Sequence, residues 1–215
     1  MAMRNLLDFN VLKAGLYKHL NYNDCYMLEP KRLFDLFLAL FAILVLLLPF
    51  ILIALVVYFT SPGPILFWSD RIGQYNSIFK MPKFRTMLIG TPAVATHLLS
   101  NPKQYLTSAG SFLRKSSLDE LPQLLSILKG DMSFVGPRPA LFNQHDLIAL
   151  RTEKGVDKLL PGLTGWAQIN GRDELPIPEK VKLDVHYLNN QSFWLDLKII
   201  FLTFKKVLKK DGIVH

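Results

Sequence analysis

The chain has 215 residues and a formal net charge of +8 at pH 7, which is enough for one modest domain together with one membrane element. Its single cysteine, Cys25, excludes an intrachain disulfide and fits a reducing compartment. The excess of positive charge suits an anionic membrane or a phosphorylated substrate, and a long apolar run favours both over nucleic acid.

Residues 1–30 have a mixed composition. A short amphipathic helix on the membrane surface and a loosely ordered leader both fit them. The apolar side chains that would line such a helix are Leu6, Leu7, Phe9, Val11, Leu12, Leu16, Tyr17 and Leu20. A cleavable signal peptide does not fit, because the apolar run starts too deep, is too long and has no small-residue cleavage site behind it.

The chain is organised around an apolar run from Leu36 to Phe59. As a helix it would be roughly 36 Å long, against about 30 Å for the core of a bilayer. Pro49 near the middle predicts a bend. Basic residues lie on both flanks, so a crossing helix would place one basic flank on the wrong side of the membrane. The sequence therefore favours a re-entrant membrane helix over residues 31–60, bent at Pro49. Full crossing and a buried core helix are the alternatives.

The segment after the run begins with a Ser-Pro-Gly-Pro turn at 61–64 and continues with a short strand over 65–68. Residues 70–73, Asp-Arg-Ile-Gly, are predicted to form a turn. Residues 88–108 hold few signals and are predicted to form a loop with a short helix.

The stretch FKMPKFRTM, residues 79–87, sets Lys83 and Arg85 among aromatic and apolar neighbours. Contact with lipid head groups and a phosphate-binding site both explain this pattern.

The stretch SSLDELPQLLSILKG predicts a helix that begins at Ser117 and ends at Gly130. Ser117 and Glu120 match a capping box, in which each side chain satisfies a backbone amide of the other residue. Pro122 fits poorly in a second turn, so the helix is expected to restart there. One apolar stripe recurs along it: Leu118, Leu121, Leu125 and Leu128.

Asp119 and Glu120, at the start of this helix, have two explanations. Acidic residues in a first turn stabilise a helix by interacting with its dipole. However, Arg114 lies one turn upstream and Arg138 follows between two prolines. A carboxylate pair amid arginines also suits a divalent metal ion and a phosphoryl group. The residues alone leave both explanations open.

The C-terminal part is predicted to be mainly helical, with helices within 143–160, 179–188 and 195–210. A glycine-rich loop at 161–173 has neither P-loop nor dinucleotide-binding spacing. It contains Arg172 and suits either a nucleotide site or a tight connection. The last helix sets lysines apart from an apolar stripe, which fits a helix on an anionic membrane or a core-facing helix with a solvated lysine face. That stripe is Leu197, Ile200, Phe201, Phe204 and Leu208.

These stretches together resemble the bacterial sugar transferases, specifically the small monotopic phosphoglycosyl transferases. The resemblance covers Lys31 to Leu208 and rests on KRLFDLFLAL, DRIG, FKMPKFRTM, LRKSSLDELPQLLSILKGDMSFVGPRP, PGLTGWAQINGR and LDVHYLNNQSFWLDLKIIFLT. Many members have Ser-Pro at the bend of the membrane helix, where this chain has Leu48 and Pro49.

The resemblance implies transfer of a phospho-sugar from a UDP-sugar to polyprenol (undecaprenyl) phosphate, with release of UMP, as the first step of a bacterial glycan. It also implies a re-entrant helix, a place on the cytoplasmic face of the bacterial inner membrane, Mg²⁺ as cofactor, and downstream glycosyltransferases as partners. A homo-oligomer is left open, and no nucleic acid is expected.

The same resemblance assigns roles to residues of this chain. Asp119 is implied to be the nucleophile that forms a phosphosugar–aspartyl intermediate. Glu120 is implied to hold the magnesium ion with Asp119 or to handle a proton. The residues matched to phosphate or nucleotide binding are Lys83, Arg85, Arg114, Arg138 and Arg172.

We therefore expect an α+β fold, mostly helical with a few short strands. Its parts are a leader (1–30), a re-entrant membrane helix (31–60) and a catalytic domain (61–215). Two other functions fit the residues: a non-enzymatic membrane-surface scaffold that binds anionic lipid, and a lipid-phosphate phosphatase that uses the same carboxylates. The sequence does not identify the sugar.

Overall fold

The computed structural model describes residues 22–92, 101–171 and 175–209. The chain divides into two compact units, 1–34 and 35–215, and each is described by itself. In the first unit the described residues belong to helix α2 (Tyr22–Val45). Most of the surface helix predicted within residues 1–30 lies outside the described residues. Arg172 also lies outside them.

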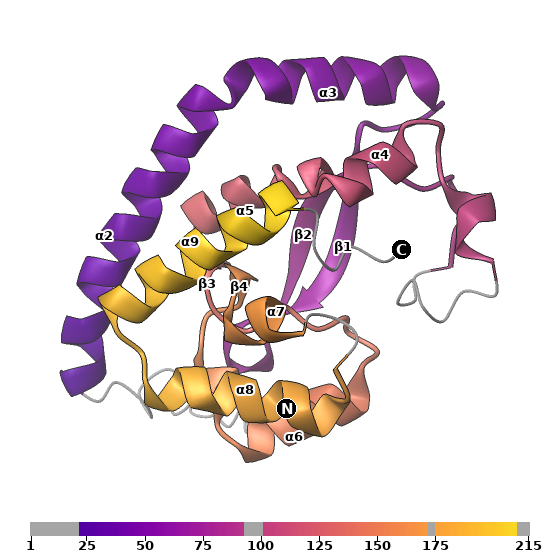
Figure 1. Cartoon of the computed structure of the whole chain (residues 1–215). Helices are drawn as coiled ribbons and strands as arrows, with labels where there is room; N and C mark the ends of the chain where they lie inside the picture. Colours follow the sequence, from indigo (N-terminus) through magenta and orange to yellow (C-terminus); the bar gives the residue numbers. More distant parts are fainter. Residues whose placement is uncertain (1–21, 93–100, 172–174, 210–215) are drawn as a thin grey trace, which may run out of the picture. The chain divides into compact units, whose positions relative to one another are not determined.

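The apolar run forms two helices, α2 and α3 (Leu47–Thr60), whose axes differ by 64° (Figure 1). The break lies at Leu46, so the prediction of a bend at Pro49 is wrong by three residues; Pro49 sits in the first turn of α3. The reason is that a proline ring collides with the carbonyl four residues earlier, which here is that of Val45. Hydrogen bonding resumes directly on the far side, where the Phe50 amide donates to the Leu46 carbonyl at 2.8 Å.

In the described part of the chain, no helix alone has the length and apolar character needed to cross a membrane. The bent pair of α2 and α3 meets that test as a pair, on length and composition.

The first strand pair is an antiparallel hairpin of β1 (Leu66–Ile72) and β2 (Ile78–Phe84). The turn predicted at 70–73 is wrong, because residues 70–72 belong to β1 and pair with β2. Asp70 lies opposite Lys80, and their side chains form an ion pair at 3.0 Å. The chain reverses instead through η1 (Gln74–Asn76), where Tyr75 and Asn76 adopt positive φ.

The second strand pair is parallel and brings together segments far apart in sequence. It consists of β3 (Ser133–Val135) and β4 (Gly162–Thr164). The connection between them contains α6 (His145–Glu153) and η5 (Val156–Lys158). Gly136 and Gly162 pack so closely that a side chain on either one would collide with the backbone of this strand pair. The second pair therefore requires these glycines.

The remaining elements are helical, which agrees with a mostly helical α+β fold. Residues 88–108 contain a short 3₁₀ turn, η3 (Pro102–Tyr105), in their described part. Shorter helices are α4 (Gly110–Lys115), α5 (Gln123–Lys129) and α7 (Trp166–Asn170). The helices predicted within 179–188 and 195–210 appear as α8 (Ile177–Asn189) and α9 (Phe193–Lys209), and the one predicted within 143–160 appears as α6.

One main core joins elements from both ends of the second unit. It includes side chains from α2, β2, α5, β3, α7, α8 and α9, namely Ala39, Phe79, Met81, Leu124, Ile127, Met132, Phe134, Val135, Ile169, Tyr187 and Ile199. A second cluster of Ile53, Val57, Phe84 and Leu113 packs α3 against β2 and α4. Both arms of the bent pair therefore share cores with the rest of the second unit.

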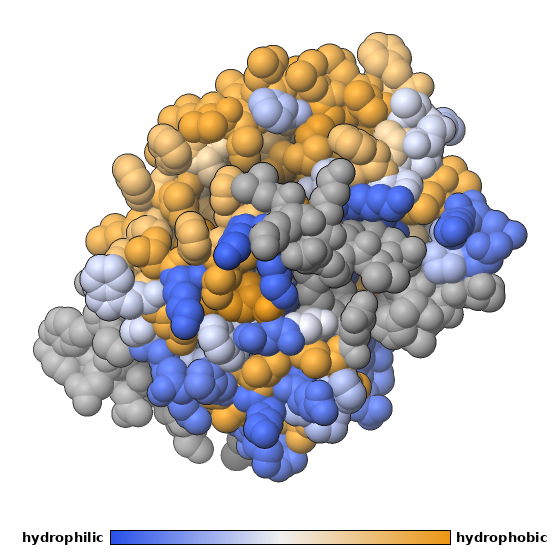
Figure 2. Space-filling view, viewed as in Figure 1, coloured by the Kyte–Doolittle hydropathy of each residue, from blue (hydrophilic) through white to orange (hydrophobic). Residues whose placement is uncertain are grey.

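The opposite face of α2 and α3 is exposed and apolar. Phe37 is 71% exposed and Phe59 is 78% exposed. Apolar side chains cover the upper part of the molecule in Figure 2, where α3 and the adjoining end of α2 run. Further exposed residues on this face are Leu40, Phe41, Leu44, Val45, Leu47, Leu48, Ile51, Leu52, Leu55, Val56 and Tyr58. An apolar surface of this extent is typical of contact with a membrane or a partner.

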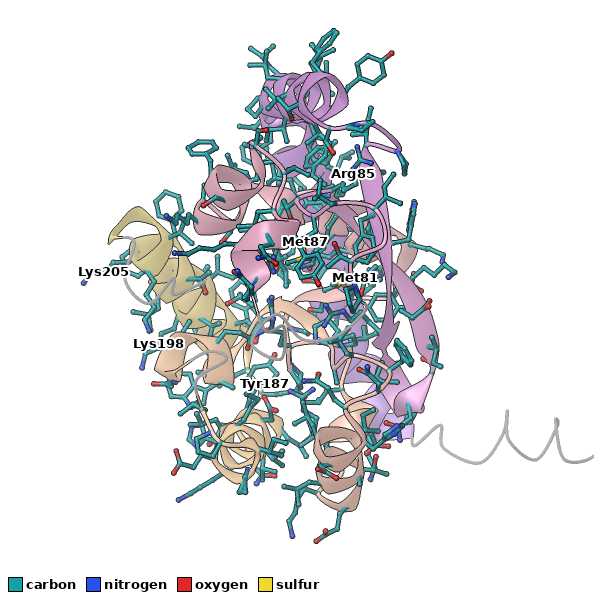
Figure 3. The ribbon with its side chains drawn as sticks, turned by 90° about the vertical axis from the view of Figure 1, so that its right-hand side faces the viewer. Met81, Arg85, Met87, Tyr187, Lys198 and Lys205 are labelled. Carbon is teal, nitrogen blue, oxygen red and sulfur yellow. The ribbon has the colours of Figure 1, made fainter. Side chains whose placement is uncertain are left out.

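Helix α9 has two apolar faces. Its inner face packs Leu195, Ile199 and Leu202 against the main core. Part of the stripe predicted from the sequence points the other way, since Phe201 and Phe204 are 66% and 63% exposed, whereas Ile200 packs against the main core. Lys198 and Lys205 also project outward from this helix (Figure 3). The helix therefore combines a core-packed face with an exposed aromatic and basic face.

Candidate active site

The acidic pair lies on a single tight turn between α4 and α5. The prediction of one helix starting at Ser117 is wrong: Ser117 has a φ of 57° and makes no side-chain cap hydrogen bond. Asp119 and Glu120 belong to the 3₁₀ turn η4 (Leu118–Glu120). The α-helix starts only after Pro122, as expected, because proline lacks the amide that would continue the ladder. Gly130 ends it with a φ of 100°, also as predicted.

Glu120 is held by two cations from distant parts of the chain. Its Oε1 accepts a hydrogen bond from Lys83 Nζ at 2.7 Å and from Arg138 Nη2 at 2.9 Å. Burial acts to raise the pKa of Glu120, but the Arg138 and Lys83 charges outweigh it, and the pKa lies well below its usual value. Glu120 is therefore firmly ionised, and its carboxylate holds Lys83 and Arg138 together.

The carboxylate of Asp119, next to Glu120 in the chain, has fewer stabilising contacts than that of Glu120. Its residue is only 7% exposed, and no hydrogen bond to its carboxylate is found among the described residues. Burial raises its pKa to about 6; Lys83 opposes this shift and the Glu120 charge adds to it. Two adjacent carboxyl groups thus have pKa values pushed apart, an arrangement common where they play different chemical roles.

Arg114 extends the positive charge beyond the Glu120 cluster. Burial lowers the pKa of its guanidinium, and the Asp119 and Glu120 charges counteract that effect. Arg114 also lines a cavity of about 440 Å³, a size within the range of small-ligand sites. The cavity is lined by Pro102, Lys103, Leu106, Thr107, Ser111, Arg114 and Lys115. Three cationic side chains and two hydroxyl groups suit a phosphate-bearing ligand.

The structure brings Lys83, Arg114 and Arg138 to the acidic pair, but it places Arg85 elsewhere. The Arg85 guanidinium donates to the carbonyls of Pro62 and Ser61, each at 2.6 Å. Arg85 is buried close to the end of α3 (Figure 3). In this arrangement it secures the chain as it leaves α3. Arg172 lies outside the described residues.

The magnesium site implied by the family resemblance would use the carboxylates of Asp119 and Glu120. No group of three or more His, Cys, Asp or Glu side chains that could hold a metal ion occurs in that part of the chain. One oxygen of Glu120 is already engaged by two cations. Mg²⁺ is commonly held by one or two carboxylates together with substrate phosphates. The pair therefore fits a site that phosphate oxygens complete.

A buried ion pair next to this cluster was not predicted from the sequence. Arg151 of α6 donates to Asp184 of α8 at 2.8 and 3.0 Å, and to the backbone carbonyl of Arg138 at 2.8 Å. The position of Asp184 could have indicated a buried acidic side chain, because it lies three residues after Val181 on the inner face of α8. Nothing in the spacing links it to Arg151, 33 residues away.

Known proteins match most of the chain. Residues 26–210 match the family model described as bacterial sugar transferase. The chain is 44% identical to an uncharacterised sugar transferase, EpsL, from Bacillus subtilis, over 85% of this chain and 89% of that protein.

Two longer relatives carry more specific names. One is the UDP-glucose:undecaprenyl-phosphate glucose-1-phosphate transferase of Escherichia coli, 40% identical over 84% of this chain and 40% of that protein. The other is the undecaprenyl-phosphate galactose phosphotransferase of Salmonella typhimurium, 38% identical over 70% of this chain and 34% of that protein. Matches of this extent establish that the chain is a transferase and belongs to the bacterial sugar transferase family.

Proposed function

We propose that the chain transfers a phospho-sugar from a UDP-sugar to polyprenol phosphate, yielding polyprenyl-diphosphate sugar and UMP. The carrying observation is Asp119, a buried carboxyl with a pKa of about 6 that lies beside firmly ionised Glu120. A carboxylate with few partners near several cations suits nucleophilic attack on a phosphate ester. The names of the Escherichia coli and Salmonella relatives support undecaprenyl phosphate as the acceptor and a sugar phosphate as the group transferred.

The proposed reaction has two displacements at one phosphorus. An oxygen of Asp119 attacks the sugar-bearing phosphorus of the donor, the bond to the bridging oxygen breaks, and UMP leaves. A phosphate oxygen of the polyprenol phosphate then attacks the same phosphorus and releases Asp119 unchanged. Lys83, Arg114 and Arg138 hold the diphosphate and offset the charge that develops on it.

We propose that Asp119 and Glu120 also hold Mg²⁺ with the donor phosphates. When bound, the ion would supply charge neutralisation to the diphosphate. In the protein itself, Glu120 keeps Lys83 and Arg138 beside the reacting carboxylate.

We further propose that α2 and α3 form a re-entrant element in the cytoplasmic leaflet of the bacterial inner membrane. Their exposed apolar face supports insertion. Ala39 of α2 and Val57 of α3 both pack into cores of the second unit, so the same body lies beside both arms. The basic residues before and after the run then stay on one side.

A cysteine-accessibility scan tests that topology. Cysteines introduced near positions 5 and 100 should both react with an impermeant reagent from the cytoplasmic side, and opposite accessibility would rule out re-entry. Pro49→Ala should let the pair straighten. Unchanged topology and activity in this variant would mean that Pro49 does not cause the bend.

The catalytic proposal is tested by incubating purified protein with Mg²⁺ and a panel of UDP-sugars without any lipid acceptor. We expect UMP and one phosphosugar adduct on the peptide that contains Asp119, and the active donor identifies the sugar. If no donor yields UMP or an adduct, and adding polyprenol phosphate gives no turnover, the proposal fails and a lipid-binding scaffold is favoured. Water as the sole acceptor would indicate a phosphatase.

A further inference from the structure

The backbone that carries Arg138 is held by its carbonyl groups. Pro137 and Pro139 flank Arg138 and have no amide hydrogen to donate, so the usual backbone anchors are missing on both sides. The three carbonyls accept hydrogen bonds instead: Pro137 from the Gly162 amide at 2.9 Å, Arg138 from Arg151 Nη1 at 2.8 Å, and Pro139 from Arg71 Nη1 at 3.1 Å. The direction of the Arg138 side chain therefore depends on these donors.

Arg151 is the donor that contacts Arg138 itself, and its own orientation is fixed by Asp184. Its Nε and Nη2 both donate to Asp184 Oδ2, at 3.0 and 2.8 Å. This leaves Nη1 directed at the Arg138 carbonyl. Arg151 is 8% exposed and Asp184 is 2% exposed. Because the guanidinium is planar and rigid, fixing one edge on a carboxylate fixes the direction of the other edge.

The opposite end of Arg138 reaches the candidate active site, where Nη2 donates to Glu120 Oε1 at 2.9 Å. A continuous series of contacts thus runs from Asp184 through Arg151 and Arg138 to Glu120. We propose that Arg151 and Asp184 are positioning residues, which hold the Arg138 main chain so that its guanidinium meets Glu120 and the donor diphosphate. This inference rests on the proposed function.

A purely structural role, tying α6 to α8, is the competing explanation, and the test must separate the two. Removing one partner would leave a buried charge and risk unfolding. The informative variant is Arg151→Met with Asp184→Val, which replaces the pair by apolar side chains of nearly the same total volume. This double variant should stay folded, with a cooperative thermal transition close to that of the wild type.

In the folded double variant we expect kcat/KM for UMP release to fall roughly 10- to 100-fold, because a small misplacement of a contacting group has effects of this size. The same two substitutions made in an Arg138→Ala background should cost less than about threefold more. A double variant that is folded and as active as the wild type would overturn the proposal. So would losses that multiply fully in the Arg138→Ala background.

A readout independent of turnover is the crystal structure of the folded double variant. If Arg151 and Asp184 position Arg138, the hydrogen bond from Arg138 Nη2 to Glu120 Oε1, which is 2.9 Å long in the wild type, should be lost. An unchanged Arg138–Glu120 hydrogen bond would contradict positioning even if no UDP-sugar proved to be a donor. The matched control is Glu153→Gln with Lys154→Met, which removes an exposed ion pair at the end of the same helix and should leave both measurements unchanged.

Discussion

Two clusters of acidic and basic side chains lie on either side of Arg138 and differ in how completely they are paired. At Arg151 and Asp184, one carboxylate meets one guanidinium, both are buried, and the remaining donor edge binds a carbonyl. Around η4, two carboxylates face Lys83, Arg114 and Arg138, and the ion pairs of Lys83 and Arg138 converge on Glu120.

This difference in pairing indicates that the Arg151–Asp184 pair has mainly a structural role and the η4 cluster a chemical one. The charges of Arg151 and Asp184 compensate each other and both side chains are buried, so little of the pair is available to a ligand. In the η4 cluster, Asp119 is buried and its negative charge is only partly compensated by the nearby cations, which raises its pKa to about 6. A folded protein tolerates such a group mainly where it has a function. We therefore expect the loss of a single partner from the first cluster to lower stability, and substitutions in the second cluster to lower activity directly.

The largest effect is expected at Asp119. Asp119→Asn removes the proposed nucleophile, so UMP release should fall by at least about 10³-fold and the peptide adduct should disappear. The measurement is UMP release with and without polyprenol phosphate. The matched control is Asp70→Asn, which removes an exposed carboxylate from the surface pair with Lys80 and should retain full activity. Equal activity of both variants would exclude Asp119 from the reaction.

The next largest effect is on folding. Asp184→Ala leaves the Arg151 guanidinium buried without its carboxylate. The free energy of unfolding should fall by about 3–5 kcal/mol, measured by denaturant titration in detergent. Asp131→Ala, which removes the partner of the exposed Lys129 side chain, should change it by less than about 1 kcal/mol. Similar free energies of unfolding for the two variants would contradict a structural role for the Arg151–Asp184 pair.

Arg138 belongs to both clusters, through its carbonyl and its guanidinium. Arg138→Ala should keep the carbonyl contact and remove the guanidinium. Because a charge-assisted hydrogen bond is worth about 1.5–3 kcal/mol, activity should fall about 10- to 100-fold, measured as kcat/KM for the donor. Lys129→Ala, on the surface, is the control. A large loss of thermal stability in place of lost activity would assign Arg138 to the structural cluster.

The smallest effect is a shift of the pH profile. Asp119 must be ionised to attack, so activity should fall as the pH drops through about 6. Lys83 lowers the pKa of Asp119; its removal in Lys83→Ala should move the midpoint upward by about one pH unit. Lys80→Ala, on the outward face of the same strand, should leave the midpoint in place. A downward shift for Lys83→Ala would show that another group governs the profile.

Local chemistry made several features predictable. Pro122 and Gly130 mark where α5 starts and ends, because one lacks an amide hydrogen and the other tolerates positive φ. The apolar run from Leu36 to Phe59 predicted a bent helix in contact with a membrane, and its exposed apolar face supports that interpretation. Conflicts arose where long-range contacts decided the outcome. Glu120 fits a capping box by sequence, but two cations from other elements bind its carboxylate.

The sequence by itself determined which residue types are available and in which short segments: an acidic pair, arginine between prolines, and a bent apolar helix between basic flanks. Only the tertiary structure decided that Lys83 and Arg138, 37 and 18 residues from Glu120, meet at one oxygen atom. It also directed Arg85 to the end of α3 and joined Arg151 to Asp184. The physical reason is that charge pairing and burial depend on distances in space, which local propensity and spacing along the chain do not encode.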